Sequence, residues 1–317
     1  MPLHHFHVVF ARRADGPPPR FIRLIEHECH RRGMTFVHCQ NHDQAEVLRA
    51  ALLDGTLQID CLIDYMGRSF CNDTAFCRAV KDAGGLVVDD PDRVALFGDK
   101  ALMHEELCRA GLEMPRTLLW QPWMPSRDLT PDERAILGPR IVCKPAAGSG
   151  ANGVVLDLPP TRAGLDAARA YDPEDTFLLQ EFVAPMVLDG RPAWFRVYNC
   201  FGRVYACFWH PETHETRLVS PGEIAWYRLH ELERISQTIA RISGYTWFSS
   251  EVALAERDGR AVFLPIDYLN NKCFMLTQAE VGGHGMPDTL AEEVARVMVE
   301  HAHAHTARRA APARAAA

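Results

Sequence analysis

Short apolar runs alternate with stretches of helical periodicity over residues 4–90 of the chain. Apolar runs of about four to eight residues bounded by turn residues indicate buried strands, and the periodic stretches between them indicate helices. This alternation predicts a parallel sheet with covering helices. The expected strands are residues 5–10, 35–39, 59–63 and 86–88, and the expected helices are residues 18–32, 43–53 and 72–83.

The middle of the chain carries signals for helix starts and stops. Asp99 can cap a helix that Gly111 ends. Thr130 and Glu133 form a capping box, with Pro131 at the first helical position. A further helix is expected at residues 161–170, and an apolar strand at residues 176–182.

The last third of the chain has the pattern of antiparallel hairpins. Apolar runs flank Gly202, and others flank Asp258 and Gly259, which are a strong two-residue turn signal. Residues 306–317, rich in alanine and arginine, are expected to be a disordered tail. The expected strands are residues 194–201, 203–210, 246–256 and 260–270, and the expected helices are residues 229–243 and a last helix from residue 287.

Composition limits the architecture and excludes several classes of function. A length of 317 residues, with 47% hydrophobic and 24% charged residues, is typical of a globular protein of two or three subdomains. The net charge of −7 disfavours nucleic acid as a partner, and no apolar run is long enough to span a membrane. The ten cysteines form no C-x-x-C pair, and the first residues read as a core strand rather than a signal peptide. A cytoplasmic location with reduced thiols is therefore expected.

The most informative stretch is residues 141–156, in which an apolar run delivers Lys144 to a loop of small residues. Gly148, Gly150 and Gly153 allow backbone N–H groups to approach an anion, and a lysine beside such a loop can grip phosphate. A second apolar run follows, so a strand is expected after the loop, which excludes a Rossmann fingerprint. The sequence also lacks the Gly-Lys-Ser/Thr of a Walker A loop and the downstream lysine of a protein kinase. A phosphate-binding hairpin remains, with an ordinary glycine-rich hairpin as the alternative.

Six features follow one another along the chain in a fixed order. They are Lys100 at a helix start, Lys144 with its glycine loop, the strand end at residues 180–183, Arg196, Glu251 and Asp267. In this order they resemble the ATP-grasp superfamily over about residues 96–300. Residues 4–90 resemble the α/β domain that precedes that fold in the family.

The resemblance implies an α/β fold class with α+β character in the C-terminal lobes. The expected layout is an N-terminal parallel-sheet α/β domain at residues 1–95, followed by a two-lobed ATP-grasp fold at residues 96–183 and 184–305.

The resemblance also implies that ATP and Mg²⁺ bind between the lobes. The charge of a triphosphate must be balanced as the γ-phosphoryl group moves, and Lys100, Lys144 and Arg196 supply cations for this, with Lys144 and Arg196 in catalytic positions. The residues implied to hold ATP are Lys100, Lys144, Gly148, Ser149, Gly150, Asn152 and Gly153, the hinge residues Gln180, Glu181, Phe182 and Val183, and Asp189 for the ribose.

Glu251 and Asp267 match the family's two metal-binding acids, and carboxylate oxygens are ligands that Mg²⁺ prefers. Family members commonly have an asparagine two residues after the second acid, where this chain has Leu269. Asn270 or Asn271 is therefore expected to supply the amide oxygen, and Asn270 is the assigned ligand.

The hairpin that carries both acids must meet a geometric condition. A two-residue turn at Asp258 and Gly259 would set Glu251 opposite Ile266 and leave Asp267 on the other face of the sheet. A three-residue loop at residues 257–259, or a bulge near Pro265, would return both acids to one face. The metal assignment requires one of these two irregularities.

The expected reaction, implied by the resemblance, is that of a ligase. A small carboxylate takes the γ-phosphoryl group to give an acyl phosphate and ADP, and an amine or thiol then displaces phosphate. The partners would be small molecules, with no nucleic acid and no membrane, and a homodimer is left open.

A kinase of the same fold, which phosphorylates a hydroxyl, is the alternative. A polyphosphate substrate would need several basic residues, whereas the presumed substrate loops at residues 210–222 and 272–286 offer Arg217 and Lys272 plus histidines. A nucleotide-binding regulator without turnover is the third interpretation.

Overall fold

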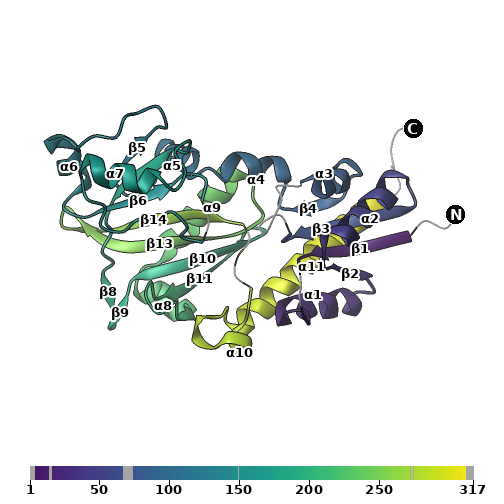
Figure 1. The fold of residues 1–317 in the computed structure, drawn as a ribbon. Helices are drawn as coiled ribbons and strands as arrows, with labels where there is room; N and C mark the ends of the chain where they lie inside the picture. Colours follow the sequence, from purple (N-terminus) through teal and green to yellow (C-terminus); the bar gives the residue numbers. More distant parts are fainter. Residues whose placement is uncertain are drawn as a thin grey trace, which may run out of the picture.

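Figure 1 shows a computed structural model of the chain, which describes residues 4–13, 16–66, 74–148, 150–271, 273 and 275–311. Within these residues the N-terminal sheet has four parallel strands in the order β2-β1-β3-β4, which confirms the predicted parallel sheet. Its elements are β1 (His4–Ala11), α1 (Arg20–Arg31), β2 (Phe36–Cys39), α2 (His42–Leu53), β3 (Leu57–Asp64), α3 (Ala75–Asp82) and β4 (Leu86–Val88).

The C-terminal helix α11 (Asp288–Ala310) returns to this sheet and packs beside α1, as Figure 1 shows in yellow. The hydroxyl of Thr306 donates to the buried carboxylate of Asp60 at 2.8 Å, and Arg309 donates to a carbonyl oxygen of β3 at 2.9 Å. The expectation of disorder is therefore wrong for residues 306–310, because these side chains hold the last turns of the helix on the sheet. The rest of the expected tail, after Ala311, lies outside the described residues.

The middle sheet is antiparallel in the order β5-β7-β6. Its neighbouring helices begin as the sequence predicts, because Asp99 accepts a hydrogen bond from the N–H of Leu102 and Thr130 forms the capping box with Glu133. The elements of this region are α4 (Pro91–Phe97), α5 (Lys100–Arg109), β5 (Thr117–Trp120), α6 (Pro131–Leu137), β6 (Ile141–Pro145), α7 (Arg162–Arg169) and β7 (Phe177–Glu181).

The prediction of a strand after the glycine loop is wrong. The chain does return along β6, but Val155 forms only an isolated antiparallel bridge with Cys143. Two residues later, Asp157 has a φ of +55°, which breaks the extended run. The segment after the glycine loop is therefore joined to β6 by this bridge and does not form a strand.

The third sheet is antiparallel in the order β12-β11-β10-β13-β14, and its hairpins turn at Gly202 and at Asp258 with Gly259 as predicted. Nowhere in the described parts of the chain is a helix both long and apolar enough to cross a membrane. The remaining elements are β8 (Val187–Leu188), β9 (Arg191–Pro192), β10 (Trp194–Cys200), β11 (Arg203–Trp209), β12 (Thr216–Leu218), α8 (Pro221–Trp226), α9 (His230–Ser243), β13 (Trp247–Arg257), β14 (Arg260–Asn270), α10 (Gln278–Val281) and a 3-10 turn, η1 (Gly282–His284).

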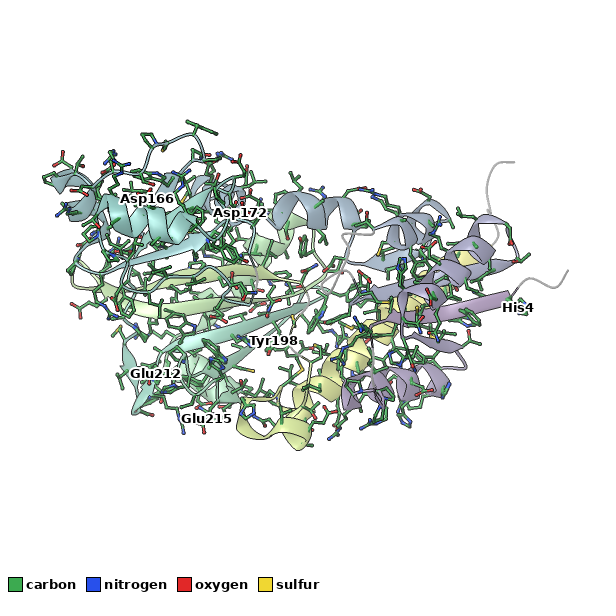
Figure 2. All side chains as sticks on the ribbon, in the orientation of Figure 1. His4, Asp166, Asp172, Tyr198, Glu212 and Glu215 are labelled. Carbon is green, nitrogen blue, oxygen red and sulfur yellow. The ribbon has the colours of Figure 1, made fainter. Side chains whose placement is uncertain are left out.

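The third sheet takes part in two hydrophobic cores. Along β10, Phe195 and Val197 lie in a core with α9 and α5. Tyr198 and Cys200 lie in another core with α11 and the N-terminal sheet, and Figure 2 shows Tyr198 where these parts meet. Because side chains alternate along a strand, Arg196 shares the face of Tyr198, away from α9. Arg196 therefore points to the side of the third sheet on which the N-terminal sheet lies.

Candidate active site

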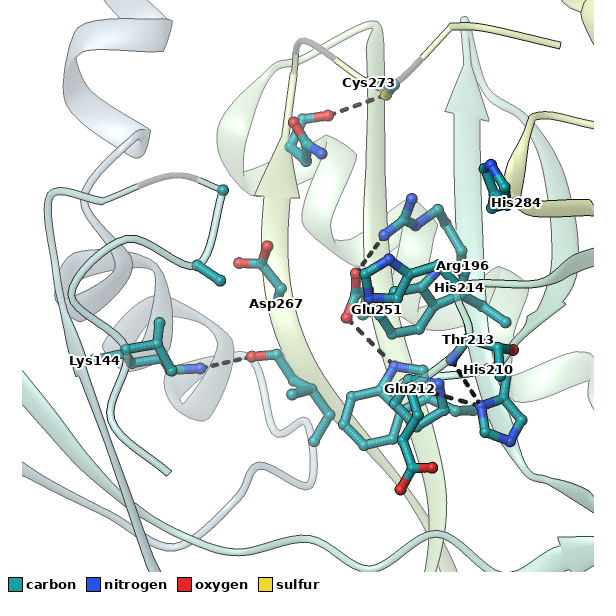
Figure 3. Close-up of a pocket in the computed structure, with 18 of the residues that line it drawn as sticks. Lys144, Arg196, His210, Glu212, Thr213, His214, Glu251, Asp267, Cys273 and His284 are labelled. Carbon is teal, nitrogen blue, oxygen red and sulfur yellow. Dashed lines mark hydrogen bonds and ion pairs between the residues drawn. The ribbon is translucent and has the colours of Figure 1, made fainter. Parts of the chain in front are cut away.

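A cleft of about 1510 Å³ is lined by residues of the middle sheet, the third sheet and the N-terminal domain. Most of the residues predicted from the sequence line it. They are Lys100, Lys144, Gly148, Gly150, Asn152, Gln180, Glu181, Phe182, Val183, Arg196, Glu251, Asp267 and Asn270. In the close-up of Figure 3, Lys144 approaches from one side, Glu251 and Arg196 lie on the other, and Asp267 lies between them.

The structure leaves three predicted residues out of this lining. Ser149 lies outside the described residues. At Gly153 an added Cβ would come within 2.6 Å of the ring of Tyr171, so close packing requires this glycine. Asp189 lies in the turn between β8 and β9, where its carboxylate accepts a hydrogen bond from the hydroxyl of Tyr227. Neither Gly153 nor Asp189 lines the cleft.

Both predicted lysines are held by backbone carbonyl groups. The Nζ of Lys144 donates to the carbonyl oxygen of Ile266 at 2.7 Å, a contact from β6 to β14 that Figure 3 draws. The Nζ of Lys100 donates to the carbonyl oxygen of Gly148, which ties the glycine loop to the start of α5. Burial lowers the pKa of Lys144 from 10.5 to about 8, although Asp267 opposes this change. A buried ammonium of this kind is well placed to receive an anion.

A β-bulge sets the two acids on one face of the third sheet. The turn at Asp258 and Gly259 has two residues, so the three-residue loop does not occur. Val252 pairs with Pro265, but the next residue back, Glu251, pairs with Asp267. Ile266 is therefore an extra residue in β14, which is the bulge that the metal assignment required. The bulged residue is also the one whose carbonyl oxygen receives Lys144.

The carboxylates of Glu251 and Asp267 have different surroundings. Glu251 accepts hydrogen bonds from Arg196 Nη2 at 2.6 Å and from Trp194 Nε1 at 3.3 Å. Burial and the neighbouring Asp267 raise the pKa of Glu251, whereas Arg196 opposes this. Asp267 Oδ1 is buried without a hydrogen-bond partner among the described residues. An oxygen left in this state, beside a second acid, fits a divalent cation that prefers hard oxygen ligands.

A second irregularity in the same hairpin brings Asn270 beside the acids. Ser249 pairs with Asn270, so two steps along β13 from Glu251 correspond to three steps along β14 from Asp267. Directly opposed residues share a face of the sheet, and Asn270 therefore lies on the face of both acids. Leu269 instead packs against the core formed with α9. The extra residue places Asn270, three positions after Asp267, on the face where a regular strand would place a residue two positions after it.

Comparison with solved structures shows which fold this chain has. The ATP-grasp RimK domain protein of Sphaerobacter thermophilus superposes with a TM-score of 0.61 at 17% identity, over 93% of this chain and 99% of that one. The D-alanine–D-alanine ligase of Bacillus anthracis, in complex with ATP, superposes with a TM-score of 0.60 at 14% identity, over 95% of this chain and 99% of that one. D-cycloserine synthetase DcsG superposes with a TM-score of 0.59 at 14% identity, over 93% of this chain and 99% of that one. This chain has the ATP-grasp fold. By sequence, no protein-family model and no curated protein matches it.

A buried hydrogen-bond chain fixes the orientation of Gln180 at the cleft. The hydroxyl of Thr117 donates to the carbonyl oxygen of Pro115 at 2.8 Å, so it must accept from Gln180 Nε2, also at 2.8 Å. The second hydrogen of Nε2 goes to the hydroxyl of Tyr268 at 3.0 Å. Both hydrogens are then used, which leaves the Gln180 carbonyl oxygen as an acceptor at the cleft.

His104 completes this chain of hydrogen bonds beneath the cleft. Its Nδ1 lies 2.8 Å from the hydroxyl of Tyr268. Burial, assisted by the charge of Lys144, lowers the pKa of His104 to about 4, so the ring is neutral near pH 7 and accepts the tyrosine proton. Neither Tyr268 nor His104 was predicted as a site residue, because their link to Gln180 joins three separate elements.

Further residues of the cleft were not predicted from the sequence. Trp194 lines the cleft and holds Glu251, and Trp209 lies under the Arg196 guanidinium at 4.7 Å. A signal was present, since Trp194 and Arg196 are two apart on β10 and so share a face. Arg12 reaches the cleft from the N-terminal domain, where no local pattern marked it.

Proposed function

We propose that the protein is an ATP-dependent, ADP-forming carboxylate–amine ligase. The observation that carries the proposal is the meeting of Lys144 and its glycine loop with Glu251 and Asp267 across one cleft. The structural neighbours support it, since two of them are named as a D-alanine–D-alanine ligase with bound ATP and a D-cycloserine synthetase.

The nucleotide would lie between the middle and third sheets. Lys100 and Lys144 would contact its phosphates together with the backbone of the glycine loop. The base would lie at residues 180–183, where the guanidinium of Arg140 covers the ring of Phe182 at 3.6 Å. Because Asp189 is engaged with Tyr227, the ribose-binding acid stays a prediction.

Glu251, Asp267 and Asn270 would hold magnesium, since their oxygens share one face and Asp267 Oδ1 lacks another partner in the described chain. The metal would supply charge compensation for the triphosphate. Arg196 lies beside this group and could reach an anionic substrate as well as a phosphate. These assignments give each charged group in the centre of the cleft a role.

The proposed chemistry has two steps. A carboxylate oxygen of the first substrate attacks the γ-phosphorus of ATP, the bond to the β-phosphate oxygen breaks, and ADP leaves. The amine nitrogen of the second substrate then attacks the acyl carbon, the carbon–oxygen bond to phosphate breaks, and the amine loses a proton as the amide forms. Holding both substrates in one cleft supplies proximity, and excluding water protects the acyl phosphate.

Trapping with hydroxylamine tests this function. Hydroxylamine converts an acyl phosphate into a hydroxamate, so the full-length protein with ATP, Mg²⁺ and the correct acid should form a hydroxamate without any amine substrate. A panel of small carboxylic acids and amino acids identifies that acid. A stable phosphorylated alcohol, formed in equal amount with ADP, would establish the alternative kinase and overturn the ligase.

A further inference from the structure

A cluster of metal-ligating side chains lies in the N-terminal domain, away from the cleft. Among the described residues, one ring nitrogen of His5, one of His7 and one carboxylate oxygen of Asp60 lie within 4.8 Å of one another. The two histidines lie in the first half of β1, Asp60 lies in the middle of β3, and none of the three lines the cleft. Figure 2 shows the neighbouring His4 at the end of the domain that points away from Tyr198. The cluster is therefore separate from the acids assigned to magnesium.

The chain around Asp60 holds its carboxylate in one orientation. Oδ1 accepts a hydrogen bond from Gln58 Nε2 at 2.9 Å and pairs with Arg309 Nη1 at 3.3 Å. Oδ2 accepts from the hydroxyl of Thr306 at 2.8 Å and lies 2.8 Å from His5 Nε2. Asp60 is fully buried, so these partners, two of which come from the last turns of α11, fix which oxygen faces the histidines. Carboxylates that ligate metals are commonly held by outer hydrogen bonds of this kind.

Thr35 provides the outer partner of His7. Its hydroxyl donates to the carbonyl oxygen of His5 at 3.1 Å, so the lone pairs of that hydroxyl can accept from the backbone N–H of His7 at 2.9 Å and from His7 Nδ1 at 2.8 Å. In this tautomer Nε2 of His7 keeps its lone pair for a cation. The N–H of Thr35 also lies 3.0 Å from Nδ1, so the other tautomer has a partner as well, and a bound ion would select between them.

The charge state of His7 suits a metal ligand. Burial, assisted by the charge of His5 and opposed by that of Asp60, lowers the pKa of His7. The rings of the two histidines lie 4.3 Å apart between their centroids, so a positive charge on both would be costly. A neutral imidazole is the form that ligates a metal.

The kind of ion follows from the donor set. Two imidazole nitrogens with a single carboxylate suit zinc, whereas Mg²⁺ prefers sites made of oxygen ligands. Zinc bonds of about 2.0–2.1 Å in tetrahedral geometry place two ligand atoms about 3.3 Å apart. His5 Nε2 and Asp60 Oδ2 are 2.8 Å apart, so they would separate by about half an ångström, which the partly exposed His5 ring can reach by turning. Because both histidines are partly exposed, water can complete the coordination.

We propose that His5, His7 and Asp60 bind a zinc ion, which joins the first strand of the N-terminal sheet to the last helix of the chain. Asp60 already receives Thr306 and Arg309 of α11, so an ion on its carboxylate would stabilise the contact between α11 and the sheet. The ion would lie outside the cleft and would take no part in its chemistry. The proposal therefore does not depend on the ligase function.

Titration with ZnCl₂ tests the site in full-length protein that a chelator has first freed of metal. Zinc should bind and raise the melting temperature, because an ion that binds only the folded state stabilises it. His5→Gln and His7→Gln should each weaken the zinc affinity by more than about 100-fold and remove the zinc-induced shift, since loss of an outer partner alone costs about 10- to 100-fold. Thr35→Val should show that smaller loss, whereas Thr35→Ser, which keeps the hydroxyl, should not.

Control variants locate the ion. His42→Gln, at an exposed position of α2, should bind zinc like the wild type, and so should Asp267→Asn, because the cleft is not involved. The test leaves the buried Asp60 intact and changes only partly exposed histidines, so the variants should fold. X-ray absorption of the zinc-loaded protein should show histidine nitrogens at about 2.0–2.1 Å. No zinc binding by the wild type, an unchanged zinc affinity in His5→Gln and His7→Gln, or a loss of binding in Asp267→Asn would each overturn the site.

Discussion

The two ends of the cleft differ in how their polar groups are satisfied. At the end assigned to the nucleotide, the chain itself positions each group: Ile266 holds Lys144, Gly148 holds Lys100, and Tyr268 orients Gln180. At the end that faces the N-terminal domain, Phe10 and Phe21 are packed in the core beneath the lining, and the guanidinium of Arg12 has no hydrogen bond or ion pair among the described residues.

This difference separates the binding of a triphosphate, which makes the same demands in any such protein, from the recognition of one particular second substrate. A triphosphate with its metal always needs cations, backbone N–H groups and hard oxygen ligands, so the residues that meet it are fixed in type and arranged in advance. A second substrate is recognised by whatever shape and charge it brings, so the residues at the other end are not fixed in type in this way. Substitutions at the first end should therefore affect every reaction of the protein, and those at the second end only its choice of substrate.

The largest expected effect is that of Lys144→Ala. Loss of the buried ammonium should lower turnover about 10³-fold, by analogy with removal of an electrostatic stabiliser of the transition state, and ATP with Mg²⁺ should no longer raise the melting temperature. Thermal unfolding with and without millimolar ATP checks this. Lys81→Ala is the control, since Lys81 pairs with Asp90 and Asp92 on the surface. Equal ATP-induced shifts in both variants would remove Lys144 from the nucleotide site.

The next largest effect is expected from Glu251→Gln and Asp267→Asn. Turnover should fall about 10²- to 10³-fold, while the affinity for ATP changes much less, because the cation contributes most as charge moves in the transition state. A Mg²⁺ titration of turnover and of ATP-induced thermal stabilisation measures both effects, and chelation of Mg²⁺ should abolish turnover. Glu256→Gln, at an exposed position of the same strand, is the matched control. A turnover in Asp267→Asn equal to that of the control would contradict the metal assignment.

A smaller effect is expected from pH. The pKa of Lys144 is lowered to about 8, so above that pH the lysine loses the charge that attracts phosphate. Affinity for ATP should then fall by up to about tenfold per pH unit as pH rises beyond 8. Nucleotide titrations between pH 7 and 9.5 measure this, and Lys144→Arg, which stays charged, should flatten the profile. The same slope in both proteins would assign the titration to another group.

The lowered pKa also predicts a trend in stability. The unfolded chain keeps the Lys144 proton up to its ordinary pKa of 10.5, whereas the folded protein releases it near pH 8. The unfolded state therefore binds more protons in this window, and the contribution of Lys144 to the free energy of unfolding should rise as pH increases from about 8 to 10.5. Comparing denaturant unfolding of the wild type with that of Lys144→Ala across this range isolates the contribution.

The smallest effect is expected from Tyr268→Phe. Without the hydroxyl, one hydrogen of Gln180 Nε2 loses its acceptor, and the amide can turn its N–H toward the cleft. Discrimination between ATP, whose base offers an amino group, and GTP, which offers a carbonyl, should fall about 3- to 10-fold in Kd. Tyr245→Phe is the control, because Tyr245 lies away from the cleft. Unchanged discrimination would show that Gln180 does not contact the base.

Much of the fold could be predicted because its signals are local. The cap at Asp99, the capping box at Thr130 and the turn at Asp258 depend on residues within a few positions of each other, and all three occur as predicted. The strand at residues 260–270 matches to the residue. The prediction of a disordered tail failed for the opposite reason. Composition could not reveal that Thr306 donates a hydrogen bond to Asp60, about 250 residues earlier in the chain.

The sequence by itself determined which residues are candidates to bind phosphate and metal, because their order along the chain accompanies a recognisable set of strands and turns. Only the tertiary structure decided how they meet. Two irregularities in one hairpin put Glu251, Asp267 and Asn270 on one face, although the sequence had left a loop and a bulge as equal choices. Arg12 reached the cleft through the docking of the N-terminal sheet. Register and docking depend on packing between distant segments, which no local pattern encodes.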